Sequence, residues 1–238
     1  MSVRPIVFLH GWGTHPVIWQ PLRARFPDSH AVPLPWYAGS AMANTLDEMA
    51  ERIAQSVVAN TILIGWSLGA QVAMRIALNQ PEKISRLVLI GATPCFVNRE
   101  DWPHGVADEV FEQFSMNLAE DYAGTIRRFL SLQAQGSDAV RTVLSELRTR
   151  LLAQPRPAEG ALEAGLGILR GTDLRNEVSR LSVPVSLIHG SGDKLAPVSA
   201  ARWLMETIPD SCLHEIKGAG HAPFLSHAEE VARLIANE

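Results

Sequence analysis

The stretch LIGWSLGAQ, residues 63–71, joins the end of an apolar run to a Gly-x-Ser-x-Gly frame centred on Ser67. A buried strand, this frame and a following helix are typical of a nucleophile elbow, a sharp turn that exposes the serine hydroxyl. Gly65 and Gly69 avoid collisions with the neighbouring strand and helix, and the helix N-terminus favours negative charge near the serine. The alternative is that Ser67 only caps the helix, because serine is also a good N-cap residue.

Apolar runs alternate with amphipathic patterns toward both ends of the chain. The runs are bounded by Gly, Pro or polar residues and predict buried parallel strands. They span residues 6–9, 30–34, 61–64, 87–90, 185–188 and 212–216. Patterns with helical spacing cover residues 45–59, 67–78, 197–208 and 227–237. Strands that alternate with helices predict an α/β fold with a mostly parallel, doubly wound sheet.

The middle of the chain breaks this alternation. It holds helical patterns without a convincing strand, at residues 107–118, 120–134, 138–153 and 159–170. We therefore expect an α/β core, residues 1–95 and 174–238, interrupted by an all-helical insertion, residues 96–173. Ligands bind at the carboxyl ends of the strands in open α/β sheets, so we expect the insertion to form a lid there.

A serine nucleophile needs a base to accept its proton, and in this fold the expected order along the chain is Ser, acid, His. His221 lies in a loop rich in small residues, whereas its rival His227 opens the last helix. Asp193 directly follows a predicted strand and fits the acid that orients the histidine. The rival acid, Asp210, lies in an ordinary turn. Asp193 also has an alternative role, in an Asx-turn or as a helix cap.

An oxyanion hole would complete such a site. One donor is expected to be the backbone N–H of Leu68, the residue after the serine. The second is expected from the loop HGWG, residues 10–13, with the Trp12 N–H as the candidate. We expect His10 to hold this loop by hydrogen bonds and to take no part in the chemistry.

Composition narrows the class of protein. The chain has 238 residues, of which 47% are hydrophobic and 19% charged, so one domain with a sizeable core is expected. A net charge of −4 argues against a nucleic-acid footprint over the whole surface. No apolar run approaches a membrane span, and the N-terminus lacks a signal-peptide pattern. Cys95 and Cys212 are expected to be reduced thiols of a cytoplasmic protein. No metal-ligand spacing is present, and no cofactor is expected.

Four motifs stand in order along the chain: HGWG, GWSLG, HGSGD and GAGHAPF. Together they resemble the α/β-hydrolase family. The segments PCF and REDWP within residues 94–103, RRFLSLQAQG at 127–136 and the ending GHAPFLSH resemble one carboxylesterase branch of that family. That branch hydrolyses the methyl ester of pimeloyl-acyl carrier protein in biotin synthesis.

The resemblance implies a catalytic triad of Ser67, Asp193 and His221. It assigns the oxyanion hole to the N–H groups of Trp12 and Leu68. The segment PLPWYAGS, residues 33–40, departs from the pattern of the related proteins. We therefore expect the wall of the site around Trp36 and Tyr37 to differ from the wall in those proteins.

The resemblance also implies a partner, an acidic acyl carrier protein held by arginines of the lid. Arg128 and Arg141 match arginine positions of this kind. Two further positions depart from the pattern, because Gly124 and Ser145 stand there instead of arginines. These departures put the detailed carrier-protein contacts in question.

Charge along the lid agrees with an acidic partner. Six arginines stand against two acidic residues within residues 124–156, a net charge of +4: Arg127, Arg128, Arg141, Arg148, Arg150 and Arg156 against Asp138 and Glu146. Such segregation favours steering of an acidic protein, and arginine suits a phosphate group. Arg127 and Arg148 lie about one turn from the missing arginines and could compensate for them. The alternative is a solvated helical surface.

The predicted function is hydrolysis of that methyl ester by a monomeric serine carboxylesterase. The acyl chain needs an apolar pocket, although each candidate for its wall could also be plain core: Trp12, Trp66, Phe129, Leu132 and Phe224. One alternative is a general short-chain carboxylesterase that acts on small free esters without a carrier protein. Another is a catalytically silent receptor on the same fold, which the complete Ser, Asp, His order argues against.

Overall fold

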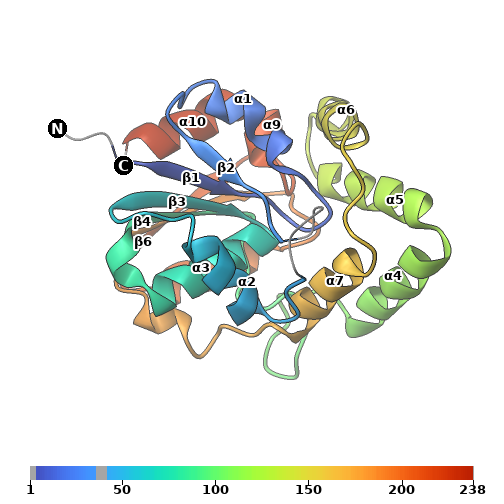
Figure 1. The fold of residues 1–238 in the computed structure, drawn as a ribbon, viewed down its shortest axis with the longest axis horizontal. Helices are drawn as coiled ribbons and strands as arrows, with labels where there is room; N and C mark the ends of the chain where they lie inside the picture. Colours follow the sequence, from blue (N-terminus) through green and yellow to red (C-terminus); the bar gives the residue numbers. More distant parts are fainter. Residues whose placement is uncertain (1–3, 36–41, 238) are drawn as a thin grey trace.

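The computed structural model describes residues 4–35 and 42–237. Trp36 and Tyr37 therefore lie outside the described residues. Within the described part, secondary structure alternates between strands and helices at both ends of the chain and is helical in the middle, as Figure 1 shows.

Six strands form one sheet in which every neighbouring pair is parallel. In spatial order they are β2 His30–Val32, β1 Ile6–Leu9, β3 Thr61–Trp66, β4 Ile84–Ile90, β5 Val185–Gly190 and β6 Ser211–Ile216. All six lie where apolar runs predicted them, with end points that differ by a few residues. Strand order reverses between β1 and β3, which makes the carboxyl ends of these two strands a switch point where ligands bind in such sheets.

Helices cover both faces of the sheet (Figure 1). On one face lie α2 Leu46–Ala54, α3 Leu68–Asn79 and α8 Val198–Thr207. On the other lie α1 Gln20–Arg23, α9 Pro223–Ser226 and α10 Ala228–Asn237. Short 3-10 helices span η1 Pro16–Trp19, η2 Pro81–Lys83 and η3 Val178–Arg180. The short helices η1, α1 and α9 were not predicted, because four residues are too few for a periodic pattern.

Local sequence explains where the main helices begin. The Thr45 side chain accepts the N–H of Glu48 at 3.1 Å, and the Glu48 carboxylate accepts the N–H of Asn44 at 2.9 Å. This reciprocal capping starts α2. α3 is packed between β3, β4 and α2, so nine of its twelve residues are buried. The predicted helix at 45–59 is shorter than expected, since α2 ends at Ala54.

The middle of the chain folds into α4 Asp108–Glu120, α5 Tyr122–Ala134, α6 Val140–Leu151 and α7 Ala161–Gly171. These four helices, called the helical region below, lie together at one end of the sheet (Figure 1). An isolated bridge pairs Cys95 with Asp173 where the chain leaves and rejoins the sheet. The helical region is fixed to the sheet loops at other points, since the N–H of Asp138 donates to the carbonyl of Gly218 at 2.8 Å.

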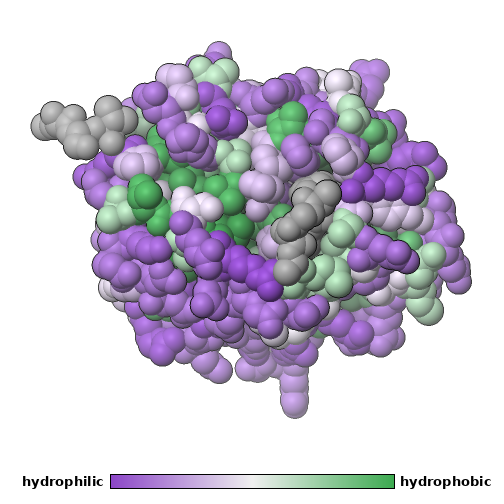
Figure 2. All heavy atoms as spheres, in the orientation of Figure 1, coloured by the Kyte–Doolittle hydropathy of each residue, from purple (hydrophilic) through white to green (hydrophobic). Residues whose placement is uncertain are grey.

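The hydrophobic core runs between the sheet and its helices and continues into the helical region. Three tryptophans are among its largest fully buried side chains, Trp12, Trp19 and Trp66, while Trp102 is buried in a separate small cluster with Cys95 and Ala200. In the orientation of Figure 1, the surface is largely hydrophilic over the helices and hydrophobic where the strands β1 to β3 reach it (Figure 2). In the described part of the chain, no helix is both long and apolar enough to cross a bilayer.

Candidate active site

Ser67 occupies a strained turn between β3 and α3. Its backbone angles are φ 57° and ψ −121°, and positive φ is uncommon for residues other than glycine. A Cβ on Gly65 would lie 2.3 Å from the carbonyl oxygen of Gly69, and one on Gly69 would lie 2.4 Å from that of Leu9. Only glycine fits at either position, so the Gly-x-Ser-x-Gly frame has a steric cause.

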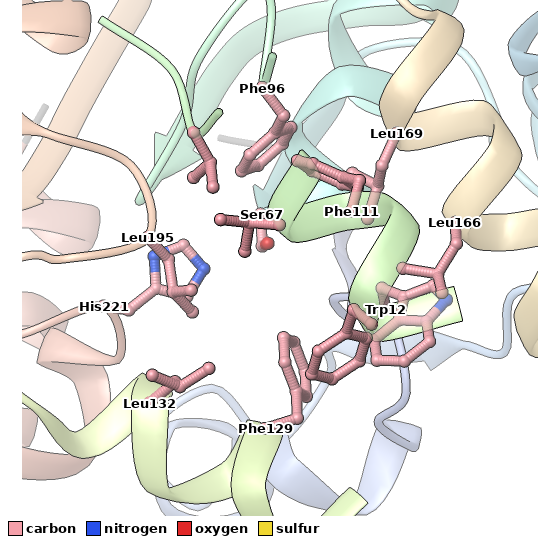
Figure 3. Close-up of a pocket in the computed structure, with 13 residues that line it drawn as sticks. Trp12, Ser67, Phe96, Phe111, Phe129, Leu132, Leu166, Leu169, Leu195 and His221 are labelled. Atoms are coloured by element: carbon pink, nitrogen blue, oxygen red, sulfur yellow. The ribbon is translucent and has the colours of Figure 1, made fainter. Parts of the chain in front are cut away.

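The Ser67 side chain does not cap the helix that follows it. α3 begins at Leu68 without a side-chain cap from Ser67. The hydroxyl instead faces a cavity at the carboxyl ends of the strands (Figure 3). The structure therefore does not support the alternative in which Ser67 only caps the helix.

Asp193 and His221 form a buried pair. The Nδ1 atom of His221 lies 2.7 Å from Oδ2 of Asp193, and both side chains are almost fully buried. Because an ionised carboxylate only accepts hydrogen bonds, Nδ1 carries the proton and donates it. The other ring nitrogen, Nε2, can accept a hydrogen bond whenever the imidazole is neutral. In Figure 3 the His221 ring faces the same cavity as Ser67.

The Asp193 carboxylate is held by backbone donors as well. Its Oδ1 accepts the N–H groups of Leu195 at 2.8 Å and Ala196 at 3.0 Å. Burial by itself would raise the pKa of Asp193, but the charge of His221 and hydrogen bonds from His189 and His221 hold the pKa well below its usual range. The carboxylate is therefore ionised at neutral pH.

The two rival residues lie elsewhere. His227 precedes α10, and its Nδ1 pairs with the hydroxyl of Ser226 at 2.8 Å. Asp210 is exposed in the turn before β6, where its carbonyl accepts the N–H of Val185. Neither residue lines the cavity that contains Ser67 and His221.

The loop after β1 approaches the serine from the neighbouring strand. A Cβ on Gly11 would lie 3.1 Å from the Cβ of Ser67, so a glycine allows this approach. We find no acceptor for the backbone N–H groups of Trp12 and Leu68 among the described residues. Both groups are therefore open to bind an oxygen of a ligand.

His10 has a structural role in this loop. Its Nε2 accepts the N–H of Leu34 at 3.0 Å, so Nδ1 carries the proton and donates to the carbonyl of Gly11 at 2.9 Å. Burial lowers the pKa of His10 to about 3, which keeps the ring neutral at ordinary pH. The Trp12 indole adds a link to the helical region, since its Nε1 donates to the carbonyl of Leu162 at 2.8 Å.

The cavity has a volume of about 580 Å³, counted to its open mouth, and its wall is apolar except for the two polar site residues. Trp12, Phe129 and Leu132 line it, as predicted (Figure 3). Eight further wall residues come from the loops and from α4 and α7, and were not singled out from the sequence: Phe96, Val106, Val110, Phe111, Phe114, Leu166, Leu169 and Leu195. Helical periodicity had marked α4 and α7 as amphipathic but could not show that their apolar faces leave a space.

Two residues predicted for the wall lie behind it. Trp66 and Phe224 are fully buried and do not line the cavity, so this prediction was wrong. Trp66 is the last residue of β3 and its side chain packs in the core, whereas Ser67 lies in the turn after the strand and faces the cavity. There Trp66 packs on Phe224, with ring centroids 5.0 Å apart, and on His221, at 5.6 Å.

A groove on the helical region adjoins the cavity. Three of the predicted lid arginines line it: Arg127, Arg128 and Arg148. Phe114 and Leu132 line both the groove and the cavity, so the two lie next to each other at these side chains.

Arg141 and Gly124, two other positions discussed from the sequence, do not line the groove. Arg141 is exposed on α6 and does not line the groove. Gly124 donates its N–H to Oδ1 of Asp121 at 2.8 Å, in the cap that starts α5. A Cβ at Gly124 would lie 1.8 Å from the other oxygen of Asp121, so an arginine there would displace the cap.

No group of three or more His, Cys, Asp or Glu side chains with the arrangement of a metal site occurs among the described residues. The chemistry that the site offers is that of a serine hydroxyl, an imidazole, a buried carboxylate and free backbone N–H groups. This set matches acyl transfer through a serine.

Comparison with known proteins extends over nearly the whole chain. A model described as the alpha/beta hydrolase family matches residues 6–234. The chain is 43% identical to a pimeloyl-(acyl-carrier protein) methyl ester esterase of Nitrosomonas europaea, over 94% of this chain and 91% of that protein. It is 42% identical to a protein of the same name from Aromatoleum aromaticum, over 99% and 98% of the two chains.

Solved structures agree in fold at lower identity. An esterase from Exiguobacterium antarcticum superposes with a TM-score of 0.88 at 22% identity, over 99% of this chain and 91% of that chain. A bromoperoxidase from Bacillus anthracis also gives 0.88, at 20% identity, over 100% and 93% of the two chains. On the strength of the family match and of relatives above 40% identity, this chain belongs to the α/β hydrolase family.

Proposed function

We propose that this protein is a serine carboxylesterase that hydrolyses the methyl ester of pimeloyl-acyl carrier protein, in biotin synthesis. The products are pimeloyl-acyl carrier protein, with a free terminal carboxylate, and methanol. The observation that carries the proposal is the His221–Asp193 pair, whose His221 ring lines the same apolar cavity as Ser67. The names of two relatives above 40% identity supply the substrate.

The proposed reaction begins with attack of the Ser67 Oγ on the methyl ester carbonyl, while Nε2 of His221 accepts the hydroxyl proton. Asp193 keeps the imidazole in the required tautomer and stabilises its positive charge. When the tetrahedral intermediate collapses, the bond to the methoxy group breaks and His221 gives its proton to the departing methanol. Water then attacks the acyl-enzyme with His221 as base, which releases the acid and restores Ser67.

The oxyanion of both tetrahedral intermediates would be bound by the backbone N–H groups of Trp12 and Leu68. Leu68 is the first residue of α3, so its N–H has no acceptor within the helix. The positive end of α3 adds a favourable field for the developing negative charge. Both donors belong to backbone that the neighbouring strands hold in place, which suits them to stabilise charge without rearrangement.

The wall of the cavity suits the chain of the proposed substrate. A pimeloyl chain with a methyl ester end is neutral and apolar, and the wall beside Ser67 and His221 consists of apolar side chains. The arginine groove, which shares Phe114 and Leu132 with the cavity, would take the phosphate-bearing arm and the acidic carrier protein. We therefore place the methyl ester at Ser67 and the carrier protein at Arg127, Arg128 and Arg148, with Arg141 on its periphery.

We further propose that residues 96–173 act as a lid on a core made of residues 1–95 and 174–238. Support comes from α4, α5 and α7, each of which contributes side chains to the cavity wall. One chain supplies every proposed catalytic group, so we expect a monomer to be active. Two free cysteines and a carrier-protein substrate favour the cytoplasm as the place of reaction.

The test compares two substrates, methyl pimeloyl-acyl carrier protein and the free dimethyl ester of pimelate. We expect wild-type protein to hydrolyse the carrier-bound ester with the higher kcat/KM, and Ser67→Ala to lose nearly all activity on both substrates. Wild-type turnover by Ser67→Ala would contradict the mechanism. Equal kcat/KM on the two esters would instead favour a general short-chain carboxylesterase, which the neutral, apolar cavity wall would also suit.

Complementation tests the pathway. We expect the gene for this chain to restore growth without biotin to a bacterial strain that lacks this esterase step, and the Ser67→Ala version to fail. Growth with both versions would show that the esterase chemistry is not what restores biotin synthesis.

A further inference from the structure

His189 is a buried histidine that the proposed reaction does not use. It lies on β5, one residue before the end of the strand, and β5 is paired with β4 on one side and with β6 on the other. Only 1% of its side chain is exposed. A histidine in such a position must satisfy its ring nitrogens within the protein, so its partners indicate what it does.

The partners of His189 belong to the loop that carries Asp193. Its Nε2 lies 2.7 Å from the carbonyl oxygen of Ala196 and 3.3 Å from Oδ2 of Asp193. A carbonyl and an ionised carboxylate both accept hydrogen bonds and cannot donate them. The Nε2 atom of His189 must therefore carry a proton, which it donates to the Ala196 carbonyl while it lies beside the carboxylate.

Ala196 links His189 to the carboxylate. The N–H of Ala196 donates to Oδ1 of Asp193, and the carbonyl of Ala196 accepts the proton of His189. Oδ2 of Asp193 lies between two imidazole N–H groups, 2.7 Å from Nδ1 of His221 and 3.3 Å from Nε2 of His189. Both carboxylate oxygens are thus restrained, one by backbone and the other by a rigid strand through His189.

We propose that His189 is a positioning residue that fixes the orientation of the Asp193 carboxylate toward His221. The inference rests on the proposed function, since it concerns the acid of that triad. A carboxylate held only at Oδ1 could turn about its last side-chain bond and carry Oδ2 away from the imidazole. The N–H of His189 beside Oδ2 opposes this rotation before substrate binds, and small losses of alignment cost much of the rate in such sites.

The test uses two amides that differ in where they place a donor. Glutamine can bring its side-chain nitrogen close to the position of the histidine Nε2, whereas the shorter asparagine reaches only the position of Nδ1. We expect His189→Asn to lower kcat on dimethyl pimelate by roughly ten-fold to a hundred-fold with KM nearly unchanged. We expect His189→Gln to stay within about three-fold of wild type.

Folding is separated from positioning by counting active sites. Each variant is labelled to completion with a fluorophosphonate, and kcat is expressed per labelled Ser67, so that unfolded protein does not enter the rate. The inference is overturned if kcat per labelled site is the same for His189→Asn as for wild type, or if His189→Gln falls as far as His189→Asn. Ser67→Ala runs in parallel: turnover by that variant would overturn the proposed triad itself, whereas its inactivity beside a fully active His189→Asn would overturn only the role of His189.

Discussion

The indole Nε1 of Trp66 donates a 2.8 Å hydrogen bond to the carbonyl oxygen of His221, a residue 155 positions further along the chain. Trp66 is the last residue of β3 and directly precedes Ser67. The side chain of the residue that leads into the proposed nucleophile therefore holds the backbone of the proposed base. This single contact fixes the loop after β6 against the end of β3, and it is buried on both sides.

Trp66→Phe should reduce catalysis by loosening His221. Phenylalanine keeps a ring against Phe224 but leaves the carbonyl of His221 buried without its donor, which costs roughly 1 to 3 kcal/mol. We expect kcat on a p-nitrophenyl ester to fall by about ten-fold or more, while Ser67 can still be labelled by a fluorophosphonate. Thermal unfolding of the variant measures how much of the cost appears as lost stability.

Trp19→Phe is the matched control, because Trp19 belongs to the same aromatic cluster and is equally buried. Its ring centroid lies 4.4 Å from that of Phe224, but its Nε1 is buried without a hydrogen-bond partner among the described residues. The control therefore removes the same atoms and no hydrogen bond, so kcat should stay near the wild-type value. Equal losses of kcat in the two variants would show that ring volume matters and the bond to His221 does not.

Gly91→Ala should displace the proposed base from the other side. Gly91 follows β4 with φ +53°, and a Cβ there would lie 3.1 Å from both Nδ1 and the carbonyl oxygen of His221. The backbone is strained for any other residue, and the new methyl group pushes on the ring that must meet Ser67. We expect kcat to fall by about a hundred-fold, measured per labelled Ser67.

A second glycine tests whether the position or the residue type matters. Gly167 lies on α7, and a Cβ at this position would meet nothing within 4 Å. We expect Gly167→Ala to keep full activity and to gain about 0.5 to 1 kcal/mol in the free energy of unfolding, because alanine favours the helix. If Gly91→Ala kept wild-type activity, contact between this strand end and His221 would have no part in catalysis.

Some features of the site could be predicted because local chemistry determines them. The Gly-x-Ser-x-Gly frame requires glycines that no other residue can replace, and parallel strands bring their carboxyl ends to one edge. Loops that follow β1, β3, β5 and β6 must therefore lie close together. This places Trp12, Ser67, Asp193 and His221 in one neighbourhood before any coordinate is known.

Other features depend on packing that a single sequence does not contain. Apolar residues on α4 and α7 have the same spacing whether they fill a core or line a cavity, so Phe111 and Leu169 carried no signal of their own. The wrong assignment of Trp66 and Phe224 has the same origin, since large aromatic residues near a nucleophile fit a wall as well as a core. Gly124 had looked like a lost arginine, but its contact with Asp121 explains the glycine.

The buried ring of His10 should make stability depend on pH. The folded pKa is about 3, whereas an unfolded histidine has a pKa of about 6.5. Between these values the unfolded chain binds the extra proton, so the free energy of unfolding decreases as the pH falls. His10 alone should lower it by about 2 kcal/mol between pH 7 and pH 5. Denaturant unfolding at the two pH values measures the change.

The variant His10→Asn isolates this contribution. Asparagine can still donate to the carbonyl of Gly11 but does not titrate. The free energy of unfolding of the wild type should therefore fall by about 2 kcal/mol relative to that of the variant between pH 7 and pH 5. A constant difference for His10→Asn would mean that the buried ring takes up a proton in the folded protein.

The arginine groove should matter only for the carrier-bound substrate. Arg127 and Arg148 line the groove that adjoins the cavity, so each alanine variant should lower kcat/KM on methyl pimeloyl-acyl carrier protein by roughly three-fold to ten-fold at low salt. The loss should appear mainly in KM, because these side chains do not line the cavity around Ser67. Activity on dimethyl pimelate should stay at the wild-type value.

Two further arginines show whether position or total charge decides this effect. Arg141 is exposed on α6 outside the groove, so Arg141→Ala should cause a smaller loss than Arg148→Ala. Arg233 is exposed on α10, which packs beside α1 and away from the helical region (Figure 1), and its alanine variant should match wild type. Added salt should shrink the differences among the variants, because screening weakens attraction between exposed charges. If Arg127→Ala and Arg148→Ala behaved like Arg233→Ala, the carrier protein would bind elsewhere and the groove would be a solvated surface.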